Sequence, residues 1–328
     1  MKVLLIQTAF IGDVILATAV IEKLKQHFPA STIDFILQKG NESLLTNHPH
    51  IRKVIIFDKK KNKYSKLLHL IKDIRKESYD YVINMHRFFS SGLITCFSGA
   101  KTTTGFKKNP LSFCFSHSVD HHIGDKSLPS HEVDRNQALI RQLTGNKSTK
   151  PRLYPASSDY THVDTQNNYI VIAPASIWFT KQFPAKKWIE LINLLPDEYK
   201  VYLIGAKNDM ELCEHIQEET KSKKVEILAG QLSFLQSAAL IKHAKMTFTN
   251  DSAPAHLASA MNAPVTMIFC STVPEFGFGP LSNVSYSIEV DSKLNCRPCG
   301  LHGKKKCPEG HFNCAEIKVN EIVSRVLS

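Results

Sequence analysis

The stretch KVLLIQTAFIGDVILATAVIEKLKQHFPASTIDFIL, residues 2–37, holds two short apolar runs on either side of a longer apolar-periodic segment. The first run is rich in Val, Leu and Ile, and Gly12 marks a turn before the periodic segment that starts at Val14. This order of strand, loop, helix and strand is typical of a parallel sheet with crossover helices. The stretch therefore predicts an α/β fold, and it resembles neither a signal peptide nor a membrane span.

The same order of elements returns in the second half of the chain. Residues 168–176 (NYIVIAPAS) predict a strand and a loop, residues 184–195 (PAKKWIELINLL) a helix, and residues 200–206 (KVYLIGA) a second strand. Two openings of the same kind indicate two similar, Rossmann-like, doubly wound α/β domains that face each other across a central cleft.

The boundary between these domains is expected in the middle of the chain. Residues 145–168 are rich in Pro, Ser, Thr, Asn and charge and predict a linker. We therefore expect an N-terminal domain over residues 1–160 and a C-terminal domain over residues 161–328. The last helix, predicted over residues 316–327, could pack back on either domain, the N-terminal one included.

The positive charge of the chain is confined to its first half. Residues 1–160 hold 24 Lys and Arg against 13 Asp and Glu, whereas the remaining residues hold 17 of each. Such a field favours an anionic partner, namely nucleic acid, acidic lipid or a phosphorylated substrate. An ordinary solubilising surface would account for the same charge.

Neither a G-x-G-x-x-G fingerprint nor a P-loop is present. The loop after the first strand therefore lacks both of these phosphate-binding motifs, and its individual residues are the candidates for function. Gly12 permits a tight turn or the close approach of a ligand. Asp13 follows at the expected helix N-terminus, where the plain interpretation is a helix cap whose charged form the helix dipole favours. A carboxylate that faced a cleft there would accept a proton from a hydroxyl group.

The corresponding loop of the second half, APASIWFTKQFP, carries Ser176, Thr180 and Lys181 ahead of a helix. Hydroxyl groups, backbone N–H groups and one Lys at the start of a helix can bind an anion, although surface capping explains them equally well. Asp209 follows the next predicted strand and is a weaker candidate for binding ribose hydroxyls.

The segment TNDSAPAHLASAMNAPV, residues 249–265, joins a strand to a helix whose N-terminus points out at the carboxyl edge of the sheet. Asp251 and Ser252 lie at that N-terminus, and His256 lies one turn further on the same face as Ser252. The segment predicts a diphosphate site. Taken alone, His256 fits a half-buried structural histidine better than a residue that contacts a ligand.

Three segments together resemble the ADP-heptose:lipopolysaccharide heptosyltransferase family, glycosyltransferase family 9. They are GDVILAT at residues 12–18, PASxWxTK at residues 174–181 and TNDSAPAHLASA at residues 249–260. SGAKTTTGF at residues 98–106 and HEVDRN at residues 131–136 are lesser matches. The C-terminal cysteine pattern looks more like the heptosyltransferase II branch.

The resemblance implies a GT-B fold and an inverting, metal-independent glycosyltransferase that needs no cofactor for catalysis. It would move heptose from an ADP-sugar, bound to the C-terminal domain, to a lipopolysaccharide core acceptor bound to the N-terminal domain. The resemblance assigns its site residues as follows: Asp13 as the general base, Lys181 and Ser176 on the leaving diphosphate, and Asp251, Ser252 and His256 around the donor sugar and phosphate.

The implied partners are a nucleotide sugar and an anionic glycolipid, with a cytoplasmic enzyme in peripheral contact with the inner face of the inner membrane. No nucleic acid is expected. His86, Arg87 and Arg135 are candidate acceptor contacts. Two lysine clusters could meet an anionic surface: Lys59, Lys60, Lys61, Lys63 and Lys66, and then Lys107 and Lys108.

Other functions stay open at this point. Ala253, Ala255 and Ile177 depart from the family pattern, so a different nucleotide-linked sugar or acceptor is an alternative. A basic nucleic-acid-binding protein is another alternative, although no nucleic-acid motif is present. A nucleotide-sugar epimerase with the same two-domain fold is a third.

Four cysteines cluster near the C-terminus in the pattern C-x2-C-x7-C-x6-C, at Cys296, Cys299, Cys307 and Cys314. Four thiols in a short segment predict a structural zinc site, although the spacing is not that of two C-x-x-C knuckles. Free thiols or an oxidised pair are the alternatives, and stable disulfides are less expected in the cytosol.

Overall fold

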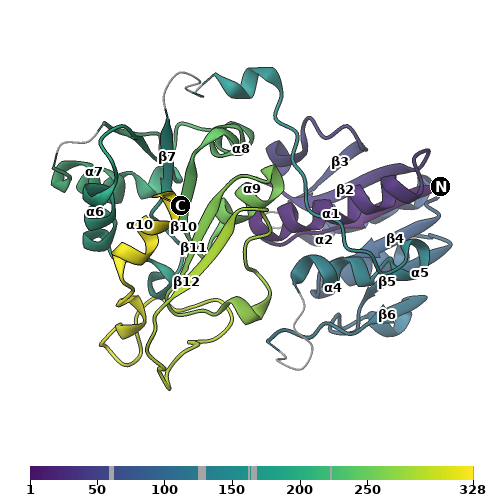
Figure 1. The fold of residues 1–328 in the computed structure, drawn as a ribbon. Coiled ribbons are helices and arrows are strands. Elements are labelled where there is room, and N and C mark those ends of the chain that lie inside the picture. The colour runs from purple at the N-terminus through teal and green to yellow at the C-terminus, as the bar shows by residue number, and fades with distance from the viewer. Residues whose placement is uncertain (59–62, 125–130, 162, 164–167, 222–223, 328) are drawn as a thin grey trace. The chain divides into compact units, whose positions relative to one another are not determined.

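The structure of the chain is a computed structural model that describes residues 1–58, 63–124, 131–161, 163, 168–221 and 224–327. The chain forms two compact units, each built on its own sheet (Figure 1). Unit 1 comprises Met1–Ile123 and Ser130–Tyr154, and unit 2 comprises Gly124–Pro129 and Pro155–Ser328. Lys59, Lys60 and Lys61 of the first lysine cluster lie outside the described residues.

Unit 1 contains a six-stranded parallel sheet with strand order β3-β2-β1-β4-β5-β6. Its strands are β1 (Lys2–Ile6), β2 (Thr32–Gln38), β3 (Ile51–Phe57), β4 (Tyr81–Asn84), β5 (Thr102–Phe106) and β6 (His117–Val119). Its helices are α1 (Ile11–His27), α2 (Lys63–Lys76), α3 (Phe89–Phe97), α4 (Glu132–Ala138) and α5 (Arg141–Thr144). The chain therefore adds β2 and β3 on one side of β1, and then β4, β5 and β6 on the other side.

Helix α1 is buried along most of its length because unit 1 covers it on more than one side. Its residues from Val14 to Leu24 are all buried, including Lys23, whose ammonium donates to the carbonyl of Gly145 at 2.8 Å. The backbone N–H of Arg152 donates to the hydroxyl of Thr18 at 3.0 Å. Part of the segment predicted as a linker, up to Tyr154, thus packs on α1 instead.

Unit 2 repeats the architecture with strand order β12-β11-β10-β7-β8-β9, again entirely parallel. Its strands are β7 (Tyr169–Ala173), β8 (Lys200–Leu203), β9 (Val225–Ile227), β10 (Met246–Asn250), β11 (Val265–Phe269) and β12 (Ser285–Glu289). Its helices are α6 (Ala185–Leu194), α7 (Met210–Glu219), α8 (Phe234–His243), α9 (Ala253–Met261) and α10 (Val319–Leu327).

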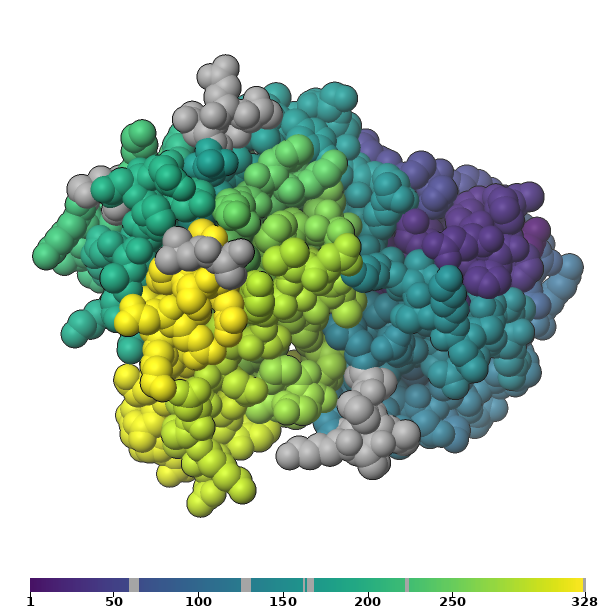
Figure 2. All heavy atoms as spheres, in the orientation of Figure 1, coloured from purple at the N-terminus to yellow at the C-terminus, as the bar shows by residue number. Residues whose placement is uncertain are grey.

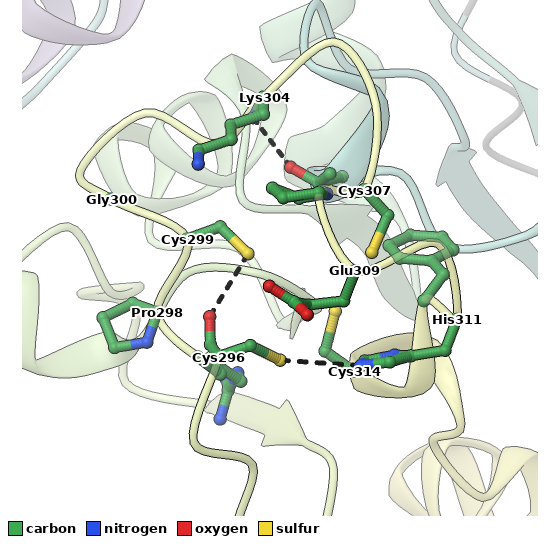
Figure 3. Close-up of a pocket in the computed structure, with 13 residues that line it drawn as sticks. Cys296, Pro298, Cys299, Gly300, Lys304, Cys307, Glu309, His311 and Cys314 are labelled. Atoms are coloured by element: carbon green, nitrogen blue, oxygen red, sulfur yellow. Dashed lines mark hydrogen bonds between the residues drawn. The ribbon is translucent and has the colours of Figure 1, made fainter.

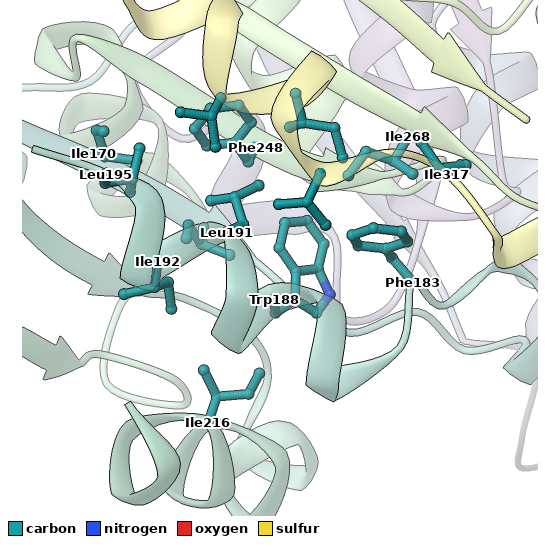
Figure 4. Close-up of a cluster of buried hydrophobic side chains, with 14 of the residues drawn as sticks. Ile170, Phe183, Trp188, Leu191, Ile192, Leu195, Ile216, Phe248, Ile268 and Ile317 are labelled. Carbon is teal, nitrogen blue, oxygen red and sulfur yellow. The ribbon is translucent and has the colours of Figure 1, made fainter. Parts of the chain in front are cut away.

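The core of unit 2 is centred on Trp188 of α6, which is fully buried (Figure 4). Phe183 meets it edge-on, with ring centroids 5.2 Å apart. Ile322 and Val326 of α10 belong to the same cluster, so the last helix packs against α6 within unit 2. In the space-filling view the yellow C-terminal residues accordingly lie on the surface of this unit (Figure 2).

The predicted α/β class and the two doubly wound sheets are confirmed. Residues 132–144 form two helices, α4 and α5, rather than one. Within the described residues, none of the helices combines the length and the apolar character that crossing a bilayer requires.

Candidate active site

The candidate site of unit 2 lies where the winding of the sheet reverses. Strands β7 and β10 are neighbours, yet β8 continues the sheet on one side and β11 on the other. Open α/β sheets bind ligands outside the carboxyl ends of the strands at such a switch point. The loops that leave β7, β10 and β11 carry Lys181, Asp251 and Thr272, so three adjacent strands deliver polar side chains to one edge.

These three side chains form a continuous chain of contacts. The ammonium of Lys181 lies 2.6 Å from Oδ2 of Asp251, and both side chains are largely buried. The hydroxyl of Thr272, which is itself fully buried, donates to the same carboxylate oxygen at 2.7 Å. Asp251 therefore fixes the positively charged ammonium of Lys181 next to the N-terminus of α9.

Asn250, the last residue of β10, ties the loop after β7 to the sheet. Its amide Nδ2 donates to the carbonyls of Pro174 at 2.8 Å and Ala175 at 3.3 Å, and its Oδ1 accepts from the backbone N–H of Phe183 at 2.8 Å. Both ends of the 174–183 loop are thereby attached to one buried side chain.

Thr180 lies beneath the surface of this loop, and other parts of unit 2 occupy its hydroxyl. The hydroxyl accepts from the backbone N–H of Lys304 at 2.8 Å and from the Ser271 hydroxyl at 3.0 Å. The backbone N–H of Thr180 donates to the carbonyl of Lys304 at 3.1 Å. The predicted ligand contact of Thr180 stays a prediction, and its observed contacts join the 174–183 loop to the C-terminal segment.

Of the other predicted residues of unit 2, Ser176, Asp209 and Ser252 follow the strands β7, β8 and β10, and His256 lies within helix α9. Ser252 is the N-cap of α9, and its hydroxyl lies 3.2 Å from that of Thr249. His256 is buried on the same helix. Asp209 accepts from the backbone N–H of Ala206 at 2.7 Å, which is a capping contact. Ser176, in the 174–183 loop, is partly exposed.

In unit 1, the corresponding switch point lies between β1 and β4, and Asp13 follows β1 there. Burial and the nearby Glu132 carboxylate raise the pKa of Asp13 to about 7. Hydrogen bonds from backbone N–H groups and the positive charge of Arg87 lower the pKa of Asp13, but by less. A carboxyl group with a pKa near 7 can serve as a general base at neutral pH.

The surroundings of Asp13 include further charged groups. His86 follows β4, and its Nδ1 lies 3.0 Å from the hydroxyl of Thr8 in the loop after β1. Glu132 at the start of α4 is buried and lies 3.1 Å from Nε2 of His121 and 2.8 Å from Nε of Arg135. Unit 1 thus places two carboxyl groups, two histidines and two arginines around the end of its switch point.

The four C-terminal cysteines line a pocket of about 390 Å³, and their sulfur atoms face its interior together with the carboxylate of Glu309 (Figure 3). Burial raises the pKa of the Cys314 thiol to about 11. All eight cysteines of the chain are free thiols. Across the part of the chain that the structure describes, no group of three or more His, Cys, Asp or Glu is arranged to hold a metal. The prediction of structural zinc is therefore not supported.

Two contributors to the site were missed by the sequence analysis. Thr272 follows β11 directly, and a hydroxyl residue at the carboxyl end of a parallel strand was a usable signal. Arg297 lies in an irregular segment, and its guanidinium donates to the carbonyls of Cys270 and Thr272 at 2.6 Å each. No periodicity or motif in the sequence marks that role.

The family described as glycosyltransferase family 9 (heptosyltransferase) matches residues 67–311. A lipopolysaccharide heptosyltransferase 3 from Escherichia coli is 28% identical over 283 residues, which cover 80% of this chain and 82% of that protein.

Two solved structures are similar along the whole chain. A glycosyl transferase of family 9 from Veillonella parvula superposes with a TM-score of 0.82 at 19% identity, covering 99% of this chain and 97% of that one. An E. coli ADP-heptose lipopolysaccharide heptosyltransferase II gives a TM-score of 0.80 at 21% identity, covering 100% and 99%. These likenesses concern the fold.

Proposed function

Because the chain belongs to glycosyltransferase family 9, the heptosyltransferases, we propose that it transfers heptose from an ADP-sugar to a lipopolysaccharide core acceptor. The chain is a glycosyltransferase with a GT-B fold. The ADP-sugar donor is proposed because a protein of the same fold acts with ADP-heptose by its description. The observation that carries the proposal is the Lys181–Asp251–Thr272 chain at the switch point of unit 2.

Lys181 is proposed to stabilise the departing diphosphate. Sugar transfer passes through an oxocarbenium-like transition state in which the leaving group gains negative charge. A preorganised cation lowers that barrier because it needs no rearrangement as the charge develops. Asp251 holds the ammonium of Lys181 in place, and the N-terminus of α9 adds backbone N–H groups to the same anion site. With this cation supplied by the protein, we propose that the transfer needs no metal.

Asp13 is proposed as the general base of an inverting displacement. The acceptor hydroxyl loses its proton to Asp13 as its oxygen bonds the anomeric carbon, while the bond from that carbon to the diphosphate oxygen breaks. Attack on the face opposite the leaving group inverts the anomeric centre. The raised pKa of Asp13, about 7, matches this task at neutral pH.

The remaining predicted residues take supporting roles in the proposal. Ser176 and Ser252 hydrogen-bond the diphosphate, His256 and Asp251 line the donor sugar, and Asp209 meets the ribose hydroxyls. The acceptor is an anionic glycolipid, so we propose peripheral contact with the inner face of the inner membrane. The positive excess of residues 1–160 supports such contact.

Nucleotide binding gives the most direct test of the donor assignment. ADP should raise the melting temperature selectively over UDP, GDP and CMP, because stabilisation follows ligand concentration over Kd. Lys181→Ala should weaken ADP binding by roughly 10- to 100-fold, as expected for loss of one charged hydrogen bond. Lys186→Ala is the matched control, since Lys186 is exposed on α6. Equal stabilisation by UDP or GDP would overturn the ADP-sugar donor.

A further inference from the structure

Residues 81–119 of unit 1 have an unusual composition, and the surroundings of Asp13 described above include only His86 and Arg87 of this stretch. This stretch lies between Asp80 and Asp120 and contains no Asp or Glu. It contains six of the 18 phenylalanines of the chain, together with Arg87, Lys101, Lys107 and Lys108. Soluble surfaces normally mix charges of both signs and expose few phenylalanines, so the placement of these side chains matters.

Helix α3 exposes a row of phenylalanines. Phe89, Leu93 and Phe97 are spaced four residues apart and therefore lie on one face of the helix. Phe89 and Phe97 are each 52% exposed, whereas Ile94 and Thr95 are buried against the unit. The helix thus has an inward face that packs on the core and a second apolar face in contact with solvent.

The loop after β5 extends this apolar face. The Asn109 amide donates to the carbonyls of His86 at 3.0 Å and Phe88 at 3.1 Å, which fixes the loop to the start of α3. Further along α3, the Cys96 thiol donates to the carbonyl of Leu111 at 3.7 Å. The next aromatic residue of the loop, Phe113, is 80% exposed. The loop and the helix therefore lie side by side.

We name the phenylalanine patch by its exposed members, Phe88, Phe89, Phe97 and Phe113. Its charged neighbours are basic. The Arg87 guanidinium lies 5.4 Å from the centre of the Phe88 ring. Lys107 and Lys108 are exposed in the loop after β5, and the ammonium of Lys107 pairs with the exposed carboxylate of Asp120 at 2.7 Å. The adjoining helix α2 contributes five Lys and Arg against a single Asp.

We infer that the phenylalanine patch and its basic neighbours are the surface through which unit 1 docks on an anionic lipid bilayer, an inference that rests on the proposed glycolipid acceptor. Aromatic side chains enter the interface between headgroups and acyl chains, while lysines stay at the anionic headgroups. Helix α3 has nine residues, so it lies on a membrane rather than spanning it. A second copy of this surface is disfavoured as its partner, because two basic patches repel each other.

Co-sedimentation with lipid vesicles tests the inference without any substrate. The wild-type protein should bind vesicles of phosphatidylethanolamine and phosphatidylglycerol (7:3) and leave vesicles of phosphatidylcholine unbound. Lys107→Gln with Lys108→Gln should lower the partition coefficient about fivefold per lysine. Phe89→Ser with Phe113→Ser should lower it by about tenfold. Leu194→Ser and the pair Lys305→Gln with Lys306→Gln, exposed on unit 2, are matched controls and should bind as wild type.

Each other outcome has a definite meaning. Wild-type protein that ignores the anionic vesicles, or patch variants that bind as tightly as the controls, would overturn the docking surface. A wild-type dimer in light scattering that Phe113→Ser converts to a monomer would assign the patch to self-association instead. Transferase activity on a deacylated acceptor tests the proposed function separately: activity without vesicle binding refutes only the docking surface, and vesicle binding without activity refutes only the proposed function.

Discussion

At Asp13, burial raises the pKa of the carboxyl group, whereas the helix dipole lowers it. From its position in the first turn of α1, the sequence predicts a stabilised charge. Backbone N–H groups do favour the charged form in the structure, yet desolvation outweighs them and Glu132 adds repulsion, so the pKa rises to about 7. A helix N-terminus in water would give the opposite shift, and the difference comes from the packing of unit 1.

The pH profile of turnover should therefore report Asp13. We expect kcat/KM to rise with pH through a midpoint near 7, because the base must be deprotonated. Asp13→Asn should lower kcat by about 10²–10⁴ and leave ADP binding intact. Glu132→Gln should move the midpoint to lower pH because it removes a neighbouring negative charge. Asp73→Asn, exposed on α2, is the control.

Stability against pH distinguishes this effect from misfolding. The pKa of Asp13 is raised above its ordinary value of 3.8, so the contribution of this group to folding is complete below pH 4 and is lost as pH rises toward 7. Asp13→Asn should therefore match wild type at pH 4 and gain roughly 1–3 kcal/mol in unfolding free energy at pH 8. A loss of stability at pH 8 would contradict the burial of the charge.

Gly303 is a second residue whose type the local structure requires, because a side chain there would not fit. Its φ is +76°, and a Cβ there would lie 2.8 Å from Cγ of Lys181 and 3.1 Å from the Thr180 hydroxyl oxygen. An added methyl group would strain the backbone and displace the side chain of Lys181.

We expect Gly303→Ala to weaken ADP binding by about tenfold, measured by calorimetry. Gly310→Ala is the matched control, because Gly310 also has a positive φ, of +75°, but has open space around it. Both variants carry backbone strain, so only the contact with Lys181 separates them. Equal losses of ADP affinity in the two variants would show that strain alone is responsible.

At the scale of elements, Arg297 secures the carboxyl end of β11. Besides the carbonyls of Cys270 and Thr272, its guanidinium donates to that of Phe269 at 3.1 Å and pairs with Glu289 of β12 at 2.7 Å. These contacts satisfy backbone acceptors that leave the sheet at its ligand-binding edge. They also fix Thr272, whose hydroxyl donates to Asp251.

Arg297→Lys should disturb the donor site without removing the positive charge. Lysine cannot reproduce the fork of guanidinium donors, so Thr272 and Asp251 should lose their fixed positions. We expect KM for the ADP-sugar to rise about tenfold with kcat changed less than about threefold. Arg141→Lys, exposed on α5, provides the comparison. A fall in kcat with KM unchanged would point to a direct role in the chemical step.

The sequence identified the elements that have strong apolar periodicity and missed those that lack it. The strands β1, β2, β7 and β8 contain apolar runs and lie in the segments predicted as strands. The strand β5 reads TTTGF, and β6 has only three residues, so neither offers an apolar signal. They become strands because β4 provides a partner, and that long-range pairing cannot be read from a local window.

The residues of the candidate site also divide into those that the sequence predicted and those that it missed. Lys181 and Asp251 were each predicted from their position after a strand, and the family resemblance assigned both to the donor. Arg297 was missed because its contacts run from a side chain to distant backbone carbonyls within an irregular segment. The zinc prediction rested on cysteine spacing alone, and spacing does not fix how four thiols are oriented around a common point.

At the scale of the whole molecule, two sheets with the same winding order carry different chemistry. Each unit starts at its first strand, adds two strands on one side and then three on the other. The difference lies in charge and loops, since all of the positive excess falls in residues 1–160. The fold sets where a ligand can bind, and the residues at the strand ends decide which ligand that is.

The hydrogen bonds between Thr180 and Lys304 join residues that are 124 positions apart. A polypeptide emerges from the ribosome N-terminus first, and its domains fold in that order. Unit 1 has all of its residues once Tyr154 has been synthesised, whereas the loop with Lys181 lacks its backbone partner until Lys304 has been synthesised. The proposed nucleotide site is therefore completed only after the last residue of unit 1 has long been synthesised.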